Sequence, residues 1–335
     1  MKEAGKTSPS TLAGKRILIT GGLGFIGSNL AHRCVQLGAH VAIYDNLDPH
    51  SGGNLHNVQG IANSVELHFH DLINFDLLAD HVCNVDIIYN CAASTSHPFS
   101  MREPWLDLDV NSRAVVNLIE AIRRFNCRAK LVHIGTSTQL GPLRYQPADE
   151  NHPEFPTDIY SANKSVSEKY VLIYSRAYGL NATVIRLANV FGPRAAIHSP
   201  EFTFNNYFIG LALQNRDITV YGEGRQLRNV LYVDDAVEAL VSAAENEKTR
   251  GETFFAVGDQ HYSVAQIAAA TVKYIGSGRV KNIPWPKERK STEIGDAVIS
   301  NAKIKKATHW CPRCSLEEGL EKTREYFRTC LDKYL

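Results

Sequence analysis

Two hydrophobic periods alternate along the first 192 residues of the chain. Short runs rich in Val, Ile and Leu, such as "RILIT" at 16–20, are typical of buried strands, and the stretches between them carry apolar residues three and four positions apart, as helices do. The expected strands cover 16–20, 40–45, 65–71, 85–93, 129–136 and 181–192, and the expected helices cover 25–38, 109–126 and 163–179. Strands that alternate with helices predict an α/β fold with a doubly wound parallel sheet.

The alternating pattern weakens after residue 192. The remainder is rich in loops, with expected helices near 203–214, at 234–245 and at 315–334, and an expected strand at 217–222. We therefore expect a sheet domain at 14–192 and a smaller, mainly C-terminal α/β lobe at 193–335 that binds the substrate. Segments at about 228–260 are expected to return to the sheet domain. Residues 1–13 are mostly polar, and we expect a disordered tail there.

The turn after the first strand, "TGGLGFIG" at 20–27, has the spacing of a dinucleotide-binding loop. Gly21, Gly24 and Gly27 permit a tight turn, a close approach of the backbone to a pyrophosphate, and close packing of helix on strand. The N-terminus of the following helix would present free N–H groups to the phosphates. Asp45 ends the second strand, where a carboxylate accepts hydrogen bonds from ribose hydroxyls and repels a 2′-phosphate. The domain at 14–192 is therefore predicted to be a Rossmann domain that binds NAD rather than NADP.

A second motif is "YSANK", in which Tyr160 and Lys164 are four residues apart and share one face of a helix. An ammonium group beside a phenol favours the phenolate, so we expect Lys164 to lower the pKa of Tyr160 below its ordinary value of about 10. Such a tyrosine can take the proton of a sugar hydroxyl while hydride leaves the same carbon. The spacing alone is common on surface helices, and its weight comes from the dinucleotide fold upstream.

Composition narrows the range of partners. Lys and Arg number 36 and Asp and Glu 35, so the net charge of +1 favours neither nucleic acid nor an anionic membrane. No apolar run approaches the roughly 20 residues of a bilayer-spanning helix, and the N-terminus lacks the apolar stretch of a secretory signal. The seven cysteines are scattered, as reduced thiols are, so we expect a cytoplasmic protein. "CPRC" at 311–314 lacks a second pair of ligands at suitable spacing, and we expect no metal there.

The motifs together resemble the extended short-chain dehydrogenase/reductases, specifically their NAD-dependent nucleotide-sugar epimerases and dehydratases. The resemblance extends from about residue 15 to 330. It is carried by "TGGLGFIG", Asp45, "HDL" at 70–72, "NCAAS" at 90–94, Asn111, "YSANK", "RLANVFGPR" at 186–194, "GRQLRNVLYVDDAVEA" at 224–239 and "WCPRCSLEEGL" at 310–320.

This resemblance implies roles for individual residues. Tyr160 would be the catalytic base and acid, Lys164 its partner, and Thr136 the catalytic hydroxyl. The implied cofactor contacts are Gly21, Gly24, Phe25, Ile26, Gly27, Asp45, Asn46, Asp71, Leu72, Ala92, Ala93, Thr95, Asn111, Tyr160 and Lys164. The implied substrate contacts are Thr136, Ser137, Tyr160, Asn189, Tyr221 and Arg228. Arg228 suits the diphosphate because a guanidinium can bind two phosphate oxygens at once.

The triplet that begins at Thr136 bears on the reaction. Dehydratases of the family resemble Thr-Asp-Glu here and uronate decarboxylases Thr-Ser-Glu, whereas this chain reads Thr136-Ser137-Thr138. The missing carboxylate counts against both reactions. Epimerisation at C4 of a nucleotide-diphosphate sugar, through a transient 4-keto sugar, needs only the tyrosine, the lysine and a hydroxyl. A UDP-sugar is the favoured substrate.

Several alternatives stay open. They are a nucleotide-sugar dehydratase, a decarboxylase, a C2 epimerase, an NAD(P)-dependent ketosugar reductase and a dinucleotide sensor without catalysis. The family resemblance also implies a homodimer in which the helices at 109–126 and 163–178 pair in a bundle. His97, Arg102 and Arg194 are expected in loops that could meet a charged group, although exposed cationic side chains in loops are usually solvated.

Overall fold

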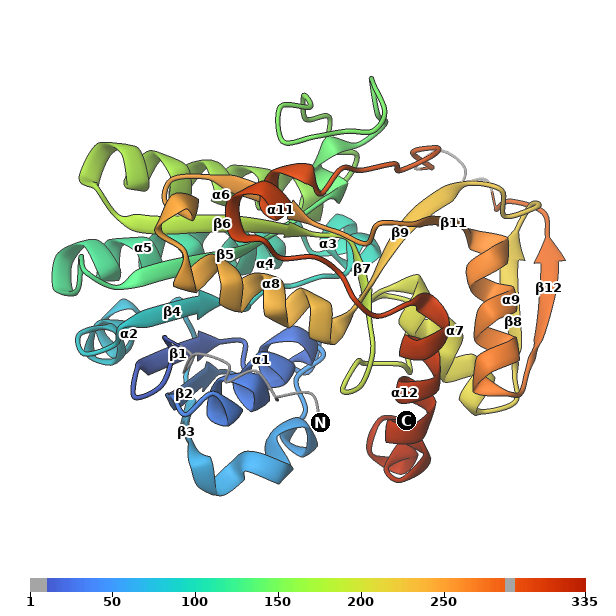
Figure 1. Ribbon diagram of the computed structural model, residues 1–335, viewed down its shortest axis with the longest axis horizontal. Coiled ribbons are helices and arrows are strands. Elements are labelled where there is room, and N and C mark those ends of the chain that lie inside the picture. Colours follow the sequence, from blue (N-terminus) through green and yellow to red (C-terminus); the bar gives the residue numbers. More distant parts are fainter. Residues whose placement is uncertain (1–10, 287–292) are drawn as a thin grey trace, which may run out of the picture.

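A seven-stranded sheet forms the centre of the protein in the computed structural model, which describes residues 11–286 and 293–335 (Figure 1). Its strands are β1 (Arg16–Thr20), β2 (His40–Asp45), β3 (Val65–Phe69), β4 (Ile87–Asn90), β5 (Lys130–Thr136), β6 (Asn181–Leu187) and β10 (Thr253–Ala256). They lie in the order β10-β6-β5-β4-β1-β2-β3, and every neighbouring pair is parallel. The predicted fold class, a doubly wound α/β sheet of the Rossmann type, is confirmed.

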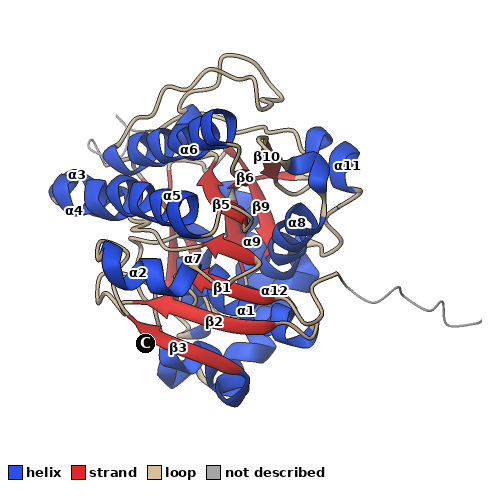
Figure 2. Ribbon diagram, turned by 90° about the vertical axis from the view of Figure 1, so that its left-hand side faces the viewer, coloured by secondary structure: helices blue, strands red, loops and turns tan. Residues whose placement is uncertain are grey.

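Helices cover both faces of this sheet. Figure 2 shows α2 (Phe75–Val82), α5 (Ala114–Phe125) and α6 (Ile159–Tyr178) on one side, and α1 (Phe25–Gln36) and α8 (Val233–Glu245) on the other. Side chains of β1 alternate between the two layers: Leu18 packs with the cluster that contains Leu118 of α5, and its neighbours Ile17 and Ile19 pack with the opposite cluster. Because both faces are buried, the central strands appear in the sequence as continuous apolar runs.

The second half of the chain builds a smaller group of elements beside the sheet (Figure 1). Its helices are α7 (Phe204–Leu213), α9 (Val264–Ile275) and α12 (Leu316–Arg328). β8 (Asp217–Tyr221) pairs with β12 (Arg279–Ile283), and β7 (Asn189–Phe191), β9 (Leu227–Tyr232) and β11 (His261–Ser263) form a three-stranded sheet. The expected strand at 181–192 is interrupted at Ala188, so that β6 joins the large sheet and β7 the small one.

Shorter elements complete the described chain. These are α3 (His97–Arg102), α4 (Pro104–Leu108), α11 (Ala302–Thr308), the π-helical turn η2 (Asp109–Arg113), and the 3₁₀ turns η1 (Leu55–Ser64), η3 (Thr138–Leu140), η4 (Glu247–Thr249) and η5 (Leu331–Lys333). Residues 1–10 of the expected tail lie outside the described residues. Leu12 is buried, and the N–H of Thr11 donates to the Glu245 carboxylate at 3.0 Å. Of the described helices, none has the length and apolar character needed to cross a membrane.

Candidate active site

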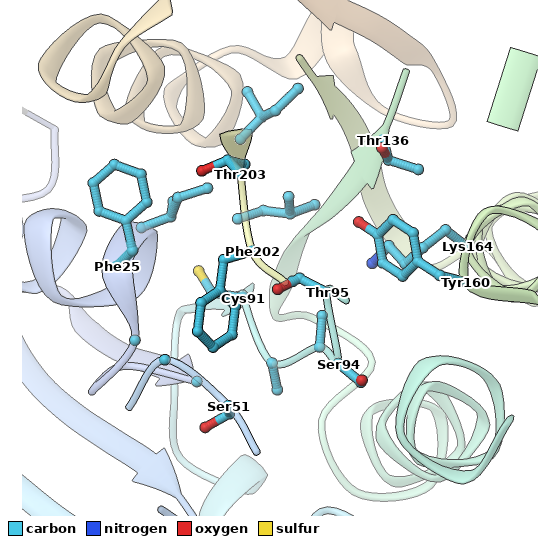
Figure 3. Close-up of a pocket in the computed structure, with 18 of the residues that line it drawn as sticks. Phe25, Ser51, Cys91, Ser94, Thr95, Thr136, Tyr160, Lys164, Phe202 and Thr203 are labelled. Atoms are coloured by element: carbon cyan, nitrogen blue, oxygen red, sulfur yellow. The ribbon is translucent and has the colours of Figure 1, made fainter. Parts of the chain in front are cut away.

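The sheet order reverses between β1 and β4, because the chain runs outward to β2 and β3 before it returns to β4. At such a point the loops at the carboxyl ends of the two strands diverge and leave a crevice. A cavity of about 330 Å³ lies there, lined by the residues that follow β1, β2, β4 and β5. Figure 3 shows Phe25 and Ser51 on one side of it and Tyr160, Lys164 and Thr136 on the other.

The glycine loop lies against the end of β4. Gly21 has a φ of +66°, and a Cβ atom there would lie 2.6 Å from the backbone nitrogen of Ala92. A Cβ on Gly27 would lie 2.2 Å from the carbonyl oxygen of Gly21. Gly24 begins α1 without a side-chain cap, which leaves the first N–H groups of that helix free for a ligand. The loop thus fits the pyrophosphate of a dinucleotide.

The Asp45 carboxylate lies at the same edge of the sheet, at the carboxyl end of β2. Its Oδ2 accepts the N–H of Leu23 at 3.0 Å and its Oδ1 accepts the N–H of Leu47 at 2.9 Å, so its orientation is fixed while each oxygen keeps acceptor capacity. Burial raises the pKa of Asp45, and the two backbone hydrogen bonds oppose that rise. Asn46 donates to Asp71 at 2.9 Å, which joins β2 to the loop after β3. The arrangement suits two ribose hydroxyls.

Tyr160 and Lys164 project from α6 into the cavity, near Thr136 at the end of β5 (Figure 3). Both side chains are almost fully buried, Tyr160 at 8% and Lys164 at 3% exposure. Burial raises the pKa of Tyr160, a hydrogen bond with Thr136 lowers it, and the Asp107 and Asp158 carboxylates raise it further. The predicted lowering of this pKa by Lys164 is wrong for the protein by itself, because desolvation of the phenolate dominates. Desolvation also lowers the pKa of Lys164, to about 8.

Of the residues implied by the sequence, all except Asn111 and Tyr221 line the cavity. Asn111 lies behind the wall, where its Nδ2 donates to the carbonyl of Ser94 at 2.8 Å and to Asp107 at 3.0 Å. Tyr221 ends β8 and packs against Trp285, with ring centroids 5.4 Å apart. Its place is set by the β8–β12 pair rather than by the large sheet.

Arg228 lines the cavity and also carries an ion pair. Its Nη2 lies 2.6 Å from Glu293 Oε1, and its Nη1 donates to the carbonyls of Leu227 and Gly295 at 2.9 and 2.7 Å. These contacts leave Nε and one proton of Nη2 for a ligand. A diphosphate would therefore share this guanidinium with Glu293.

His97 lies at the site, with contacts that the sequence did not predict. It is the first residue of α3, not a solvated loop residue, and it lines the cavity. Its Nδ1 lies 2.7 Å from Asp158 Oδ2, and its ring meets the Tyr160 ring edge-on at 4.8 Å. His97 and Asp158 are 61 positions apart, and no local pattern links them.

The "CPRC" segment forms backbone hydrogen bonds with a carboxylate of α8. The N–H groups of Arg313 and Cys314 donate to the Asp235 carboxylate at 3.0 and 2.9 Å, which ties this segment to the first turn of α8. Cys311 and Cys314 are free thiols, and burial raises the pKa of Cys314 to about 12. Within the described ranges, no group of three or more His, Cys, Asp or Glu side chains is arranged to hold a metal ion.

Comparison with known proteins places this geometry among nucleotide-sugar enzymes. Residues 17–258 match the sequence model of the NAD-dependent epimerase/dehydratase family. The chain is 32% identical to UDP-glucuronic acid decarboxylase 1 of Xenopus tropicalis, over 95% of this chain and 73% of the relative. It is 31% identical to UDP-glucose 4-epimerase of Mycolicibacterium smegmatis, over 93% of this chain and 98% of the relative. The resemblance stated from the motifs is therefore confirmed.

Solved structures agree with the sequence matches. The UDP-glucose 4-epimerase of Thermus thermophilus, in complex with NAD, superposes with a TM-score of 0.83 at 27% identity, over 94% of this chain and 99% of that one. NAD is thus the cofactor of this family and of the fold found here.

The glycine packing generates a first prediction. Gly27→Ala puts a Cβ atom 2.2 Å from the Gly21 carbonyl oxygen, so the loop must shift by an amount that costs about 1–3 kcal/mol. We expect the affinity for NAD, measured by calorimetry, to fall about tenfold or more. The control is Gly60→Ala, whose new methyl meets its nearest atom at an ordinary 3.5 Å. Unchanged affinity in Gly27→Ala would contradict the assigned role of the loop.

The His97–Asp158 pair generates a second prediction. Asp158→Asn keeps a cap for α6, because Asn accepts the Ser161 N–H as well as Asp does, but it removes the charge facing His97. The pKa of Asp158 is lowered mainly by His97 against an opposing burial effect. A lowered carboxyl pKa stabilises the fold above its ordinary value near 4 and loses that contribution as the pH falls through the folded-state pKa. We expect a loss of about 1 kcal/mol at pH 7 that fades below pH ~4, measured by urea unfolding. A loss independent of pH would show that the charge of Asp158 is not its cause.

Proposed function

The chain belongs to the NAD-dependent epimerase/dehydratase family, and from this premise we propose that it epimerises a nucleotide-diphosphate sugar at C4 through a transient 4-keto sugar. The observation that carries the choice is the distribution of carboxylates. Asp45, Asp48 and Asp71 are the acidic residues among the described lining of the cavity, and all three belong to the cofactor side, after β2 and β3. Around Tyr160 the lining supplies hydroxyls, a lysine and the His97 imidazole, but no carboxylate. The Asp107 and Asp158 carboxylates act on Tyr160 from behind the lining.

This distribution separates the candidate reactions better than overall identity does. The decarboxylase and the epimerase relatives are almost equally similar, at 32% and 31%. Elimination of water across C5 and C6 needs an additional acid and base beside the tyrosine. Thr138 stands at the position where the sequence resemblance expects a glutamate in dehydratases and decarboxylases, and it lines the cavity. Epimerisation needs no further ionisable group.

The chain's own residues would act as follows. Tyr160 Oη, as the phenolate, takes the proton of the C4 hydroxyl and becomes a phenol, and the Lys164 ammonium stabilises the phenolate before that transfer. With a pKa of about 8, Lys164 is largely protonated near neutral pH. Thr136 donates a hydrogen bond at the same point. NAD, when bound, would supply the acceptor and donor of a hydride at C4. Once the keto sugar has turned to present its opposite face, Tyr160 gives its proton back to the C4 oxygen, so the net redox change is zero.

We assign binding of the substrate diphosphate to the other side of the cavity. Arg228 and Asn189 line it, and we assign them to the diphosphate. Asn189 donates to the carbonyl of Asn229 at 2.8 Å, which holds its amide in place beside β9. A UDP-sugar is favoured because both relatives act, by name, on UDP-linked sugars. C2 epimerisation, which uses the same groups, is the alternative.

We also propose that the protein acts as a homodimer through α6 and α5, the two helices expected to pair, together with α4, which precedes α5 in the chain. Val166, Tyr170 and Ile173 follow one another on one face of α6 and are exposed, Ile173 at 55%. Trp105 of α4 is 78% exposed, and Leu108, three residues later on the same helix, is also exposed. Large exposed apolar side chains grouped on neighbouring helices are typical of an interface.

A panel of UDP-, GDP-, CDP- and dTDP-sugars, followed by NMR, tests the reaction. We expect inversion at C4 of one class of sugar, without added cofactor once NAD is bound. Tyr160→Phe should lower the rate by about 10²–10⁴-fold, since it removes the acid–base group while leaving the ring in place. Release of CO₂, a stable 4-keto-6-deoxy product, or full activity in Tyr160→Phe would contradict the proposal.

A single charged substitution tests the proposed dimer interface. Ile173→Glu places a carboxylate in the exposed apolar face of α6, and burying it unpaired in an interface is costly. We expect light scattering to show monomers at concentrations where the unaltered protein is dimeric. Leu55→Glu, an equally exposed leucine on η1, is the matched control. A dimer that persists in Ile173→Glu rules out this face.

A further inference from the structure

The hydroxyl of Thr136 has a neighbour that the proposed mechanism leaves without a role. Thr138 Oγ1 lies 3.0 Å from Thr136 Oγ1, and the Thr138 N–H donates to the same oxygen at 3.3 Å. Behind it, Ser161 Oγ donates to Thr138 Oγ1 at 2.9 Å. The three side chains connect the end of β5 with the first turn of α6, which carries Tyr160.

The hydroxyl protons of this chain can all point toward Thr136. Thr138 Oγ1 accepts the Ser161 proton, and either hydroxyl can donate between Thr138 and Thr136. When Thr138 donates, Thr136 Oγ1 accepts two donors, the hydroxyl and the N–H of Thr138. A hydroxyl oxygen has two acceptor lone pairs and one proton. With both lone pairs occupied, the Thr136 proton remains to be donated. Tyr160 lines the same cavity, and a hydrogen bond with Thr136 lowers its pKa.

Ser161 anchors the chain at its far end. Its side chain is completely buried, and its N–H donates to Asp158 Oδ1 at 2.8 Å as part of the α6 cap. The residue that starts the hydroxyl chain is therefore held by the same helix that positions Tyr160. No exposed side chain takes part, which limits exchange of these hydrogen bonds with water.

We propose that Thr138 and Ser161 are positioning residues. Their hydrogen bonds orient the Thr136 hydroxyl so that it donates its proton to Tyr160 Oη. The inference rests on the proposed function, in which Tyr160 exchanges a proton with the sugar. A hydrogen bond donated to the phenolate stabilises the charged form of the tyrosine. Thr138 is thus a relay that passes on a hydrogen bond without carrying a charge. A carboxylate at this position would disfavour the phenolate, because the two negative charges would repel each other.

Charged and titratable groups surround Tyr160 from each element packed on it. Asp107 of α4 and Asp158 at the start of α6 both raise its pKa, His97 of α3 contacts its ring, and Lys164 lies one turn further along α6. Thr136 is the group that lowers this pKa. Loss of its donated hydrogen bond should therefore be visible in the titration of the phenol.

The test is a titration of the phenol in Thr138→Val. In the NAD-saturated protein with ¹³Cζ-labelled tyrosine, the Tyr160 signal is identified by its absence in Tyr160→Phe. We expect the titration midpoint to rise by about half a unit to one unit, and the rate at neutral pH to fall about three- to tenfold, because the phenolate fraction falls by that factor. The rate should recover at high pH. Thr138→Ser, which keeps the hydroxyl, should restore both values.

Two further variants separate this effect from a loss of stability. Ser161→Ala removes the first donor and should shift the midpoint in the same direction, which also provides the test if Thr138→Val does not fold. Thr183→Val removes a completely buried hydroxyl that donates to the Thr249 carbonyl, and should lower stability without moving the Tyr160 midpoint.

The outcomes distinguish the two proposals. An unshifted midpoint in folded Thr138→Val and Ser161→Ala would overturn the relay, whatever their activity. A shifted midpoint together with a wild-type protein that epimerises no nucleotide sugar would overturn the proposed function and leave the relay supported.

Discussion

The burial of Tyr160 is the constraint on which the site depends. A phenol that must lose and regain a proton near neutral pH lies at 8% exposure between two helices and a strand end, where desolvation opposes its ionised form. The same burial keeps water away from a reactive keto sugar and strengthens every hydrogen bond in the cavity. The surrounding residues offset the cost to the phenolate: Thr136 donates to it, and Lys164 supplies a positive charge on the same helix.

This environment exists because the order of the strands reverses between β1 and β4. The glycine loop after β1 contacts the end of β4, the Asp45 carboxylate ends β2, and Thr136 ends β5. A cofactor placed in the crevice is thereby held on one side by backbone N–H groups and faces Tyr160 and Lys164 on the other. α3 and α6 complete the wall through His97–Asp158 and through the Tyr160 N–H, which donates to Ser100 Oγ at 3.1 Å.

Local signals in the sequence were sufficient for the sheet and for the cofactor loop. Gly21 and Gly27 are required by contacts within one strand–turn–helix unit, and Asp45 by the end of a strand, so their positions follow from short-range patterns. The interruption at Ala188 was not predicted, because β6 and β7 are apolar alike and differ only in which sheet they join. The place of Tyr221, an implied substrate contact that lies outside the cavity lining, depends on the distant strand β12, which no local pattern indicates.

Electrostatic properties were harder to predict than positions. The spacing of Tyr160 and Lys164 indicated an attractive pair, but the direction of the tyrosine pKa depends on burial by α3, α4 and β5, which spacing does not express. His97 and Asp158 meet only in the fold. Hydride transfer from C4 and back to C4 can be followed with the nucleotide sugar that reacts, deuterated at C4. We expect a C4-inverted product that retains the deuterium at C4, whereas loss of the deuterium to solvent or its transfer to another carbon would rule out this transfer.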